Sequence, residues 1–163
     1  MTGNSTATNR LIRDLHRLHR DRPSGISALP EASNLFFWTA LIFGPEDSEW
    51  EGGIFKLNLT FPSDYPHSPP KVVFSTVMHH PNIYADGRIC LDILQNRWTA
   101  SYDCLSILTS IQSLLTDPNV NSPANVQAAS QYSTNRDLYI QKVRECVTNS
   151  LLEHTVEEEK TEE

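Results

Sequence analysis

The sequence predicts a single α+β domain, in which one helix precedes an antiparallel sheet and further helices follow it. The chain has 163 residues and is 39% hydrophobic, which suits one domain with one core. Apolar residues recur at helical spacing near both ends of the chain, and they alternate with polar residues between positions 55 and 61. The connections between the expected strands are short, so an antiparallel meander is favoured over parallel strands joined by crossovers.

The first expected element is a helix over residues 9–21. The preceding residues 1–8 are polar and are expected to be disordered. Pro23 and Gly25 end the helix. Its apolar stripe faces the core and consists of Leu11, Ile12, Leu15 and Leu18.

Three strands are expected next. Residues 35–43 form an apolar and aromatic run, and residues 71–74 form a short one. Between them, Pro62 ends a segment in which every second residue is apolar, as in a strand buried on one face. Those apolar residues are Phe55, Leu57, Leu59 and Phe61. Five prolines then crowd residues 62–81, which predicts a stiff, irregular stretch, and the Tyr65-Pro66 bond is a candidate for the cis form.

The C-terminal part of the chain predicts three helices. Asp103 is expected to cap the first, which Asp117-Pro118 ends and whose apolar positions are Cys104, Leu108, Ile111 and Leu115. Ser122-Pro123 reads as a cap with proline at the first helical position, opening a short helix to about residue 132. Thr134 is expected to cap the last helix. The expected domain therefore covers residues 9–152, and an acidic tail covers residues 153–163.

The net charge of −7 is unevenly distributed. The tail holds six acidic residues and one lysine, a net −5, and five of the thirteen basic residues are arginines in the first 22 positions. One basic end and one acidic tail suggest protein partners at both termini rather than a nucleic-acid surface. The alternative is a solvated helix face and a solubilising tail. No apolar run approaches the roughly 18 residues of a membrane span, and the polar N-terminus is unlike a signal peptide, so a soluble protein made in the cytosol is expected.

The cysteines indicate free thiols. Cys90, Cys104 and Cys146 are an odd number at wide spacing with no CxxC pair, which disfavours disulfides and a zinc site. Any one of them could be a nucleophile, although a lone cysteine is more often a small buried hydrophobe.

The segment 79–92 has no clear periodicity and is too apolar for a disordered linker, so it is a candidate functional segment. It contains the thiol of Cys90, the amide of Asn82 and the carboxylate of Asp92. Asp86-Gly87 supplies a turn that can fold Cys90 back toward Asn82.

These groups suit the carriage of an acyl group as a thioester. When an amine attacks a thioester, an amide donor such as Asn82 can stabilise the oxyanion. A hydrolytic cysteine enzyme needs a resting thiolate, which a nearby carboxylate such as that of Asp92 disfavours. The same carboxylate could help an incoming lysine bind and lose its proton. Taken singly, a histidine in the position of His80 is more often structural than a base. An asparagine such as Asn82 is more often a turn residue than an oxyanion donor, and a cysteine such as Cys90 is more often a buried thiol than a nucleophile.

The motifs together resemble the ubiquitin-conjugating enzymes. His80-Pro81-Asn82, with Cys90 eight residues beyond Asn82, is similar to the active-site signature of that family. The supporting motifs, which occur in the family's order, are Phe43-Gly44-Pro45 with Gly52-Gly53, Tyr65-Pro66 with Pro69-Pro70, Trp98, and Asp117-Pro118-Asn119 with Ser122-Pro123. The resemblance covers residues 9–152.

The resemblance implies an N-terminal helix, a four-stranded antiparallel meander, an irregular active-site segment and C-terminal helices. It also implies that Cys90 accepts ubiquitin from an activating enzyme and passes it to a substrate lysine, usually with a RING-type ligase. Asn82 would then stabilise the oxyanion or organise the loop, His80 would support the loop, and Asp92 and Ser122 would border the lysine path. Ser122 stands where other members have Asp. No cofactor is implied, because the activating enzyme uses the ATP and Mg²⁺.

The resemblance places ligase and activating-enzyme contacts on the first helix and two loops. The residues concerned are Arg10 and Arg13; Tyr65, His67 and Pro69; and Trp98, Ala100 and Ser101. His67 and Ala100 depart from the large aromatic and the proline that many members have there, which leaves the choice of ligase open. Ser27 falls at the family's back-face ubiquitin contact.

Within the family, Gln95–Thr99, Tyr102-Asp103 and Ser122–Asn125 look most like the histone-modifying and DNA-repair branch. A monomer in the cytoplasm and nucleus, with protein substrates that include histones and with no membrane or nucleic-acid partner, is therefore expected. Three alternatives remain: a thiol hydrolase that uses Cys90 with His79 or His80, a non-catalytic ubiquitin-binding variant, and an enzyme for a ubiquitin-like modifier.

Overall fold

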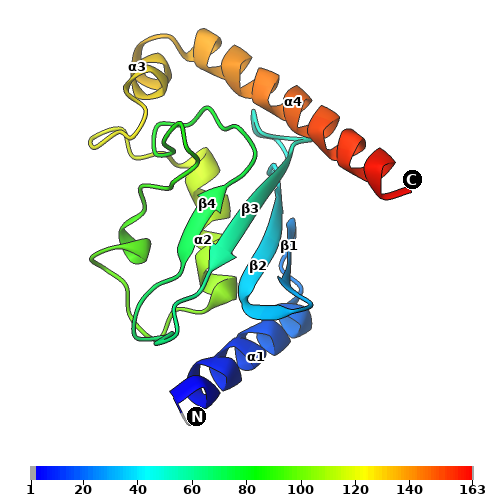
Figure 1. The fold of residues 1–163 in the computed structure, drawn as a ribbon. Helices are drawn as coiled ribbons and strands as arrows, with labels where there is room; N and C mark the ends of the chain where they lie inside the picture. The colour runs from blue at the N-terminus through cyan, green and yellow to red at the C-terminus, as the bar shows by residue number, and fades with distance from the viewer. Residues whose placement is uncertain (1–2, 163) are drawn as a thin grey trace.

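Within residues 3–162, which a computed structural model of the chain describes, four α-helices and one 3₁₀ helix surround a four-stranded sheet (Figure 1). The elements are α1 (Gly3–Asp21), β1 (Ile26–Glu31), β2 (Asn34–Phe43), β3 (Ile54–Thr60), β4 (Lys71–Phe74), η1 (Asp92–Leu94), α2 (Cys104–Thr116), α3 (Val126–Thr134) and α4 (Arg136–Glu162). The sheet is antiparallel in the order β1-β2-β3-β4. The predicted α+β fold with a four-stranded meander is therefore confirmed.

The sheet has one buried face and one outward face. Trp38 pairs with Leu59 and Ala40 pairs with Leu57, and all four side chains are buried. The inner face packs on α2, which lies behind the sheet in Figure 1 and contributes Ile107, Leu108 and Ile111 to the same core. Residues one position along each strand point outward, because successive side chains alternate between the two faces.

Strand β1 was not visible in the residue pattern and was expected from the resemblance alone. Its inward positions are the partly buried Ile26, the small Ala28 and Pro30, whereas the outward Leu29 is 58% exposed. Apolar residues therefore lie on both faces of the strand, and Pro30 weakens it further as a strand pattern.

The ends of three helices differ from the prediction. Residues 3–8, which were expected to be disordered, form the first turns of α1, where Ala7 is buried in the core. α3 begins at Val126 and is capped by Asn125, whose side chain accepts from the Ala128 N–H at 3.0 Å, and not at Ser122-Pro123. The Ala124 and Asn125 N–H groups donate instead to Pro81 O at 2.8 and 3.0 Å, which holds this loop outside the helix.

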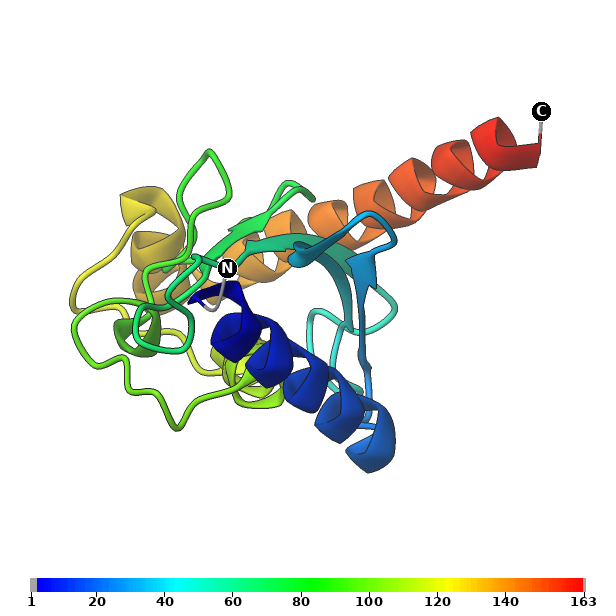
Figure 2. The ribbon, with the colours of Figure 1, turned by 60° about the horizontal axis from the view of Figure 1, so that its bottom comes forward.

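The C-terminal helix is longer than expected. α4 begins at Arg136, after Asn135 rather than Thr134, and it continues through residues 153–162, so the acidic segment is helical. An i,i+4 pair of His154 and Glu158 at 3.2 Å supports the added turns. Figure 2 shows this end of α4 projecting from the body of the domain. Positions 1, 2 and 163 lie outside the described residues.

None of the helices within positions 3–162 is both long and apolar enough to cross a membrane. The same positions bring no three His, Cys, Asp or Glu side chains together in a group suited to a metal ion.

Candidate active site

A tight hairpin folds Cys90 back on Asn82, as the Asp86-Gly87 turn predicted. The Cys90 N–H donates to Asn82 O at 2.8 Å, and the Tyr84 N–H donates to Arg88 O at 2.9 Å. Gly87 has φ +90°, and a Cβ there would lie 2.0 Å from Phe74 O. Glycine is required at this position because both the backbone angle and the close approach to β4 exclude a side chain.

Cys90 differs from the other two cysteines in its exposure. Cys90 is half-buried, whereas Cys104 is 0% and Cys146 is 9% exposed. Burial raises the pKa of the Cys104 thiol well above its ordinary value, and burial also raises the pKa of Cys146. These two thiols are held neutral inside the domain, so Cys90 is the accessible thiol of the three.

The side chain of Asn82 is buried and paired with the backbone of Asn119. Asn82 Nδ2 donates to Asn119 O at 2.7 Å, and Asn82 Oδ1 accepts from the Asn119 N–H at 2.8 Å. The amide thus holds the loop between α2 and α3 against the segment that leads to Cys90. Its donor points into this pairing, which makes it a loop organiser in this conformation.

His80 is fully buried beneath Asn82. Its Nε2–H donates to Leu114 O at 2.7 Å, and its Nδ1 accepts from the Asn82 N–H at 2.9 Å. These partners require a neutral ring with the proton on Nε2. Burial, opposed by the hydrogen bond to Leu114 and aided by the neighbouring His79, lowers the pKa of His80 to about 4. His80 is therefore a structural link between the active-site segment and the end of α2.

Asp92 and Ser122 lie on two different segments that connect to the Cys90 hairpin, one by sequence and one by hydrogen bonds. Asp92 opens the 3₁₀ helix η1 two residues after Cys90, and its side chain is exposed with Arg97 Nε at 3.8 Å. Ser122 is exposed on the loop that Asn82 and Pro81 anchor. Both side chains are open to solvent on segments that flank the thiol.

A shallow groove of about 660 Å³ begins at Leu91, beside Cys90, and runs along α2. It was not foreseen from the sequence. The apolar members of its wall are Leu91, Leu105 and Leu114, which alternate with small hydroxyl residues. The helical spacing of apolar residues in α2 marks only the core face of that helix. The groove lies on the side that carries Thr109 and Ser113.

The expected ligase contacts divide into exposed and buried residues. Arg13, His67, Ala100 and Ser101 are exposed, and Pro69 and Trp98 are half-buried. Trp98 Nε1 donates to Pro66 O at 3.0 Å, which joins the two loops of this surface. Of the other two expected contacts, Tyr65 is buried and Arg10 is half-buried.

Tyr65, which was expected to contact a partner, has its side chain turned into the core. Its side chain is 1% exposed because its ring packs edge-on against Phe61, at 4.8 Å between ring centroids, and its hydroxyl bonds Asp14. Arg10 is also largely enclosed, with an 11% exposed side chain. The Tyr65-Pro66 bond is cis, as predicted.

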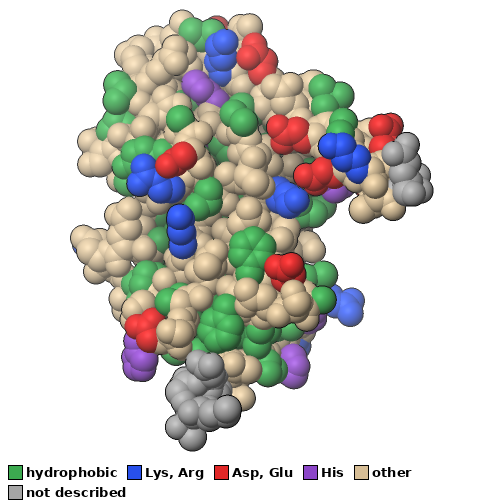
Figure 3. All heavy atoms as spheres, in the orientation of Figure 1, with side chains coloured by type: hydrophobic (Ala, Val, Ile, Leu, Met, Phe, Trp, Pro, Cys, Tyr) green, Lys and Arg blue, Asp and Glu red, His purple; other side chains and the backbone are tan. Residues whose placement is uncertain are grey.

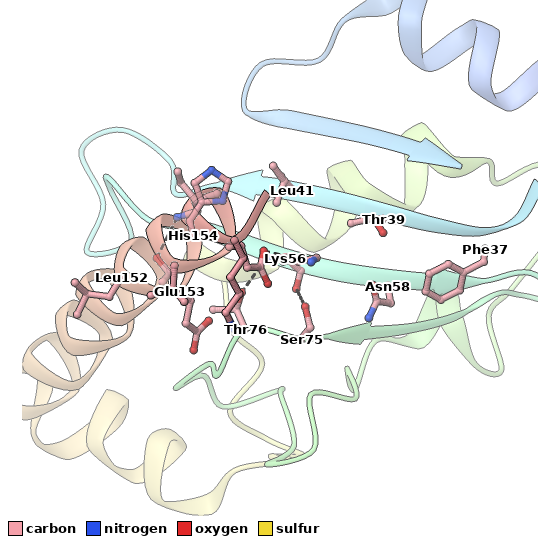
Figure 4. A pocket seen from close by; sticks show the side chains of 15 residues that line it. Phe37, Thr39, Leu41, Lys56, Asn58, Ser75, Thr76, Leu152, Glu153 and His154 are labelled. Atoms are coloured by element: carbon pink, nitrogen blue, oxygen red, sulfur yellow. Dashed lines mark hydrogen bonds and ion pairs between the residues drawn. The ribbon is translucent and has the colours of Figure 1, made fainter. Parts of the chain in front are cut away.

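Ser27 lies away from this site, on the outward face of the sheet. It pairs with Leu41, which lines a groove of about 720 Å³ between that face and the end of α4 (Figure 4). Phe37 and Asn58 lie along the open part of the same face, and Glu153 and His154 come from the helix. The hollow is separate from the segment that carries Cys90.

The comparisons with known proteins agree with this geometry. A family model described as "Ubiquitin-conjugating enzyme" matches residues 10–147. The chain is 57% identical over 144 residues to "Ubiquitin-conjugating enzyme E2 3" of Arabidopsis thaliana, covering 88% of this chain and 96% of that one. It is 56% and 55% identical over 144 residues to proteins named "Ubiquitin-conjugating enzyme E2 2" from Debaryomyces hansenii and Candida albicans, covering 88% of this chain and 86% and 80% of theirs.

A match over most of the chain, the accessible thiol on a hairpin and the four-stranded meander lead to one conclusion. The chain belongs to the ubiquitin-conjugating enzyme family, transferases that act through a cysteine thioester.

Proposed function

We propose that Cys90 is the thiol that carries ubiquitin in this enzyme. The observation that carries the proposal is its half-buried position at the end of the 84–88 hairpin, whereas Cys104 and Cys146 are enclosed in the core. The Cys90 thiolate attacks the thioester of the activating enzyme, a C–S bond forms, and the activating enzyme's thiol leaves. A substrate lysine then attacks the new thioester, a C–N bond forms, and Cys90 is released as a thiol.

Asn82 acts in this scheme first as an organiser of the loop that carries Ser122. Its two bonds to Asn119 support that role. Stabilisation of the oxyanion needs the Nδ2–H to leave Asn119 O, so we assign this second role to a state with the thioester in place.

Asp92 and Ser122 border the path of the lysine. The exposed Asp92 carboxylate attracts the lysine ammonium and can take up the proton that the amine loses on attack. The Ser122 hydroxyl can bond the amine but cannot serve as a base. The groove beside Leu91 offers a mostly uncharged surface for the body of the carried ubiquitin, since it begins at the residue next to the thiol.

The partners proposed are ubiquitin, an activating enzyme, RING-type ligases and protein substrates. Transfer to histones, a role in DNA repair and location in cytoplasm and nucleus are proposed from the motifs at residues 95–103 and 122–125. The protein needs no cofactor of its own in this scheme, and it acts as a monomer. On the face seen in Figure 3, positive and negative side chains are mixed, which fits protein partners better than nucleic acid.

One assay tests the carrier role. The protein is mixed with ubiquitin-activating enzyme, ATP-Mg²⁺ and ubiquitin, and a thiol-reducible adduct is expected. Cys90→Ser should give only a reductant-resistant ester, and Cys146→Ser, the matched control, should charge normally. The absence of an adduct beside an active control enzyme contradicts the proposal, and parallel reactions with ubiquitin-like modifiers and their activating enzymes test the alternative cargo.

A further inference from the structure

A buried carboxylate, that of Asp14, lies outside the active site and has no part in the chemistry proposed above. Asp14 is on α1 and only 2% exposed. It accepts hydrogen bonds from Arg10 Nε at 2.9 Å, from the Tyr65 hydroxyl and from the Cys104 N–H at 3.3 Å. A buried charge is costly unless it is fully paired, so such a cluster needs a reason beyond stability.

The groups around Asp14 come from three separate segments. Tyr65 belongs to the loop 62–70, Cys104 begins α2 directly after the loop 95–103, and Arg10 is one turn from Asp14 on α1. Arg10 also donates from Nη1 to Ala100 O at 2.8 Å and from Nη2 to Tyr102 O at 2.7 Å. One guanidinium therefore bonds both the carboxylate and the backbone of the second loop.

The Tyr65 and Cys104 side chains that bond Asp14 are kept in their protonated, donating forms. Burial raises the pKa of Tyr65 far above its ordinary value, with smaller effects from Cys104 and Asp14. Burial likewise raises the pKa of Cys104, so Tyr65 and Cys104 both stay protonated and donate to Asp14. Charge-assisted bonds of this kind are about twice as strong as neutral ones.

We infer that Asp14 is a positioning residue that holds the loops 62–70 and 95–103 in the arrangement that the activating enzyme and ligases recognise. The two loops present His67, Ala100 and Ser101 to solvent, while their inner sides meet at Asp14, at Arg10 and at the Trp98–Pro66 bond. The inference rests on the proposed function, because it takes these loops to be the docking surface.

The test uses the activating enzyme as the partner. Asp14→Asn keeps the size of the side chain but removes its charge, and leaving Arg10 with a neutral partner should raise the KM for this protein in transfer from the activating enzyme about tenfold. The kcat at saturation and the rate at which the isolated thioester discharges to free lysine should stay within about twofold of the unmodified protein, since neither depends on loop docking. Tyr65→Phe removes one donor and should raise KM about threefold.

The matched control is Asp21→Asn, which makes the same charge change on α1 at a 39% exposed site paired with Arg17 and Arg20. Its KM should not change. Hydrogen exchange should be faster in residues 62–70 and 95–103 of Asp14→Asn but equal in α4, which separates local loosening from general destabilisation.

Two outcomes overturn the inference. One is a KM for Asp14→Asn and Tyr65→Phe no higher than for Asp21→Asn. The other is an equal loss of discharge to free lysine, which would mark a general structural effect. Failure of the unmodified protein to charge at all would instead contradict the proposed function.

Discussion

The side-chain amide of Asn82 is paired with the backbone of Asn119 at both of its ends, Nδ2 to O at 2.7 Å and Oδ1 from N–H at 2.8 Å. This pairing joins the segment before the carrier thiol to the loop after α2, which lies 37 residues further along the chain. The pairing therefore links two parts of the site that lie far apart in the sequence.

Asn82→Ala should therefore weaken both the fold and the transfer step. Loss of two buried hydrogen bonds should lower the free energy of unfolding by about 2 kcal/mol, measured in urea. Charging should persist, and discharge of the thioester to free lysine should be at least about tenfold slower. Asn121→Ala, at an exposed position in the same loop, should match the unmodified protein in both measurements. Normal discharge by Asn82→Ala would remove the proposed role of Asn82.

His80 should make the stability of the domain depend on pH. The pKa of His80 is about 4 in the folded state, against 6.5 for the ordinary side chain. Above pH 6.5 both states are neutral, whereas between pH 6.5 and 4 the unfolded chain binds a proton that the folded one does not. The stability present above pH 6.5 is therefore lost as the pH falls toward 4, by about 3 kcal/mol in all.

The comparison that checks this is with His80→Gln, which has no titrating ring. Urea unfolding at a series of pH values should show the free-energy difference between the two proteins shrinking by about 3 kcal/mol from pH 7 to pH 4. A difference that does not vary with pH would show that His80 does not control this dependence.

Gly87→Ala should disrupt the hairpin that presents Cys90. The added Cβ would lie 2.0 Å from Phe74 O at φ +90°, so strain and overlap together should cost about 3 kcal/mol. Gly52→Ala is a matched control, because Gly52 has φ +87° with nothing within 4 Å of the added atom, and it should cost about 1 kcal/mol. Equal losses of stability would mean that the contact with β4 is unimportant.

Removal of residues 153–163 should leave the enzyme able to charge. The contacts of this end of α4 include an exposed Lys56–Glu157 pair at 3.5 Å, so the free energy of unfolding should fall by less than about 1 kcal/mol. Transfer to a basic protein such as a histone should fall, because the deletion removes a net charge of −5, while discharge to free lysine should not change.

A triple variant separates charge from helix length in that experiment. Glu157, Glu158 and Glu159 changed to Gln keep the helical turns and remove three charges. If this variant transfers to histones as well as the unmodified protein does while the deletion does not, the charge of the segment is not what the substrate recognises.

The alternation along β3, the cap at Asp103 and most of the α1 stripe could be read from the sequence, because each depends on neighbours within one element. The exception in the stripe is Ile12, which was expected to face the core and is 41% exposed. The Asp86-Gly87 turn and the Cys90 N–H to Asn82 O bond also follow from residues only eight positions apart. Strand β1 could not be read, since the exposed Leu29 and the inward Ile26 put apolar residues on both of its faces.

Cys90 could be selected from three cysteines in the sequence only through its resemblance to a family, whereas the tertiary structure distinguishes it by exposure. Tertiary structure alone decided that Asn82 bonds Asn119 and that Tyr65 turns inward. It also decided that Asp14 bonds Tyr65 and Cys104, which lie 51 and 90 residues away in the chain. The physical reason is that burial and pairing depend on which distant segments come into contact, and a local pattern of residues does not show those contacts.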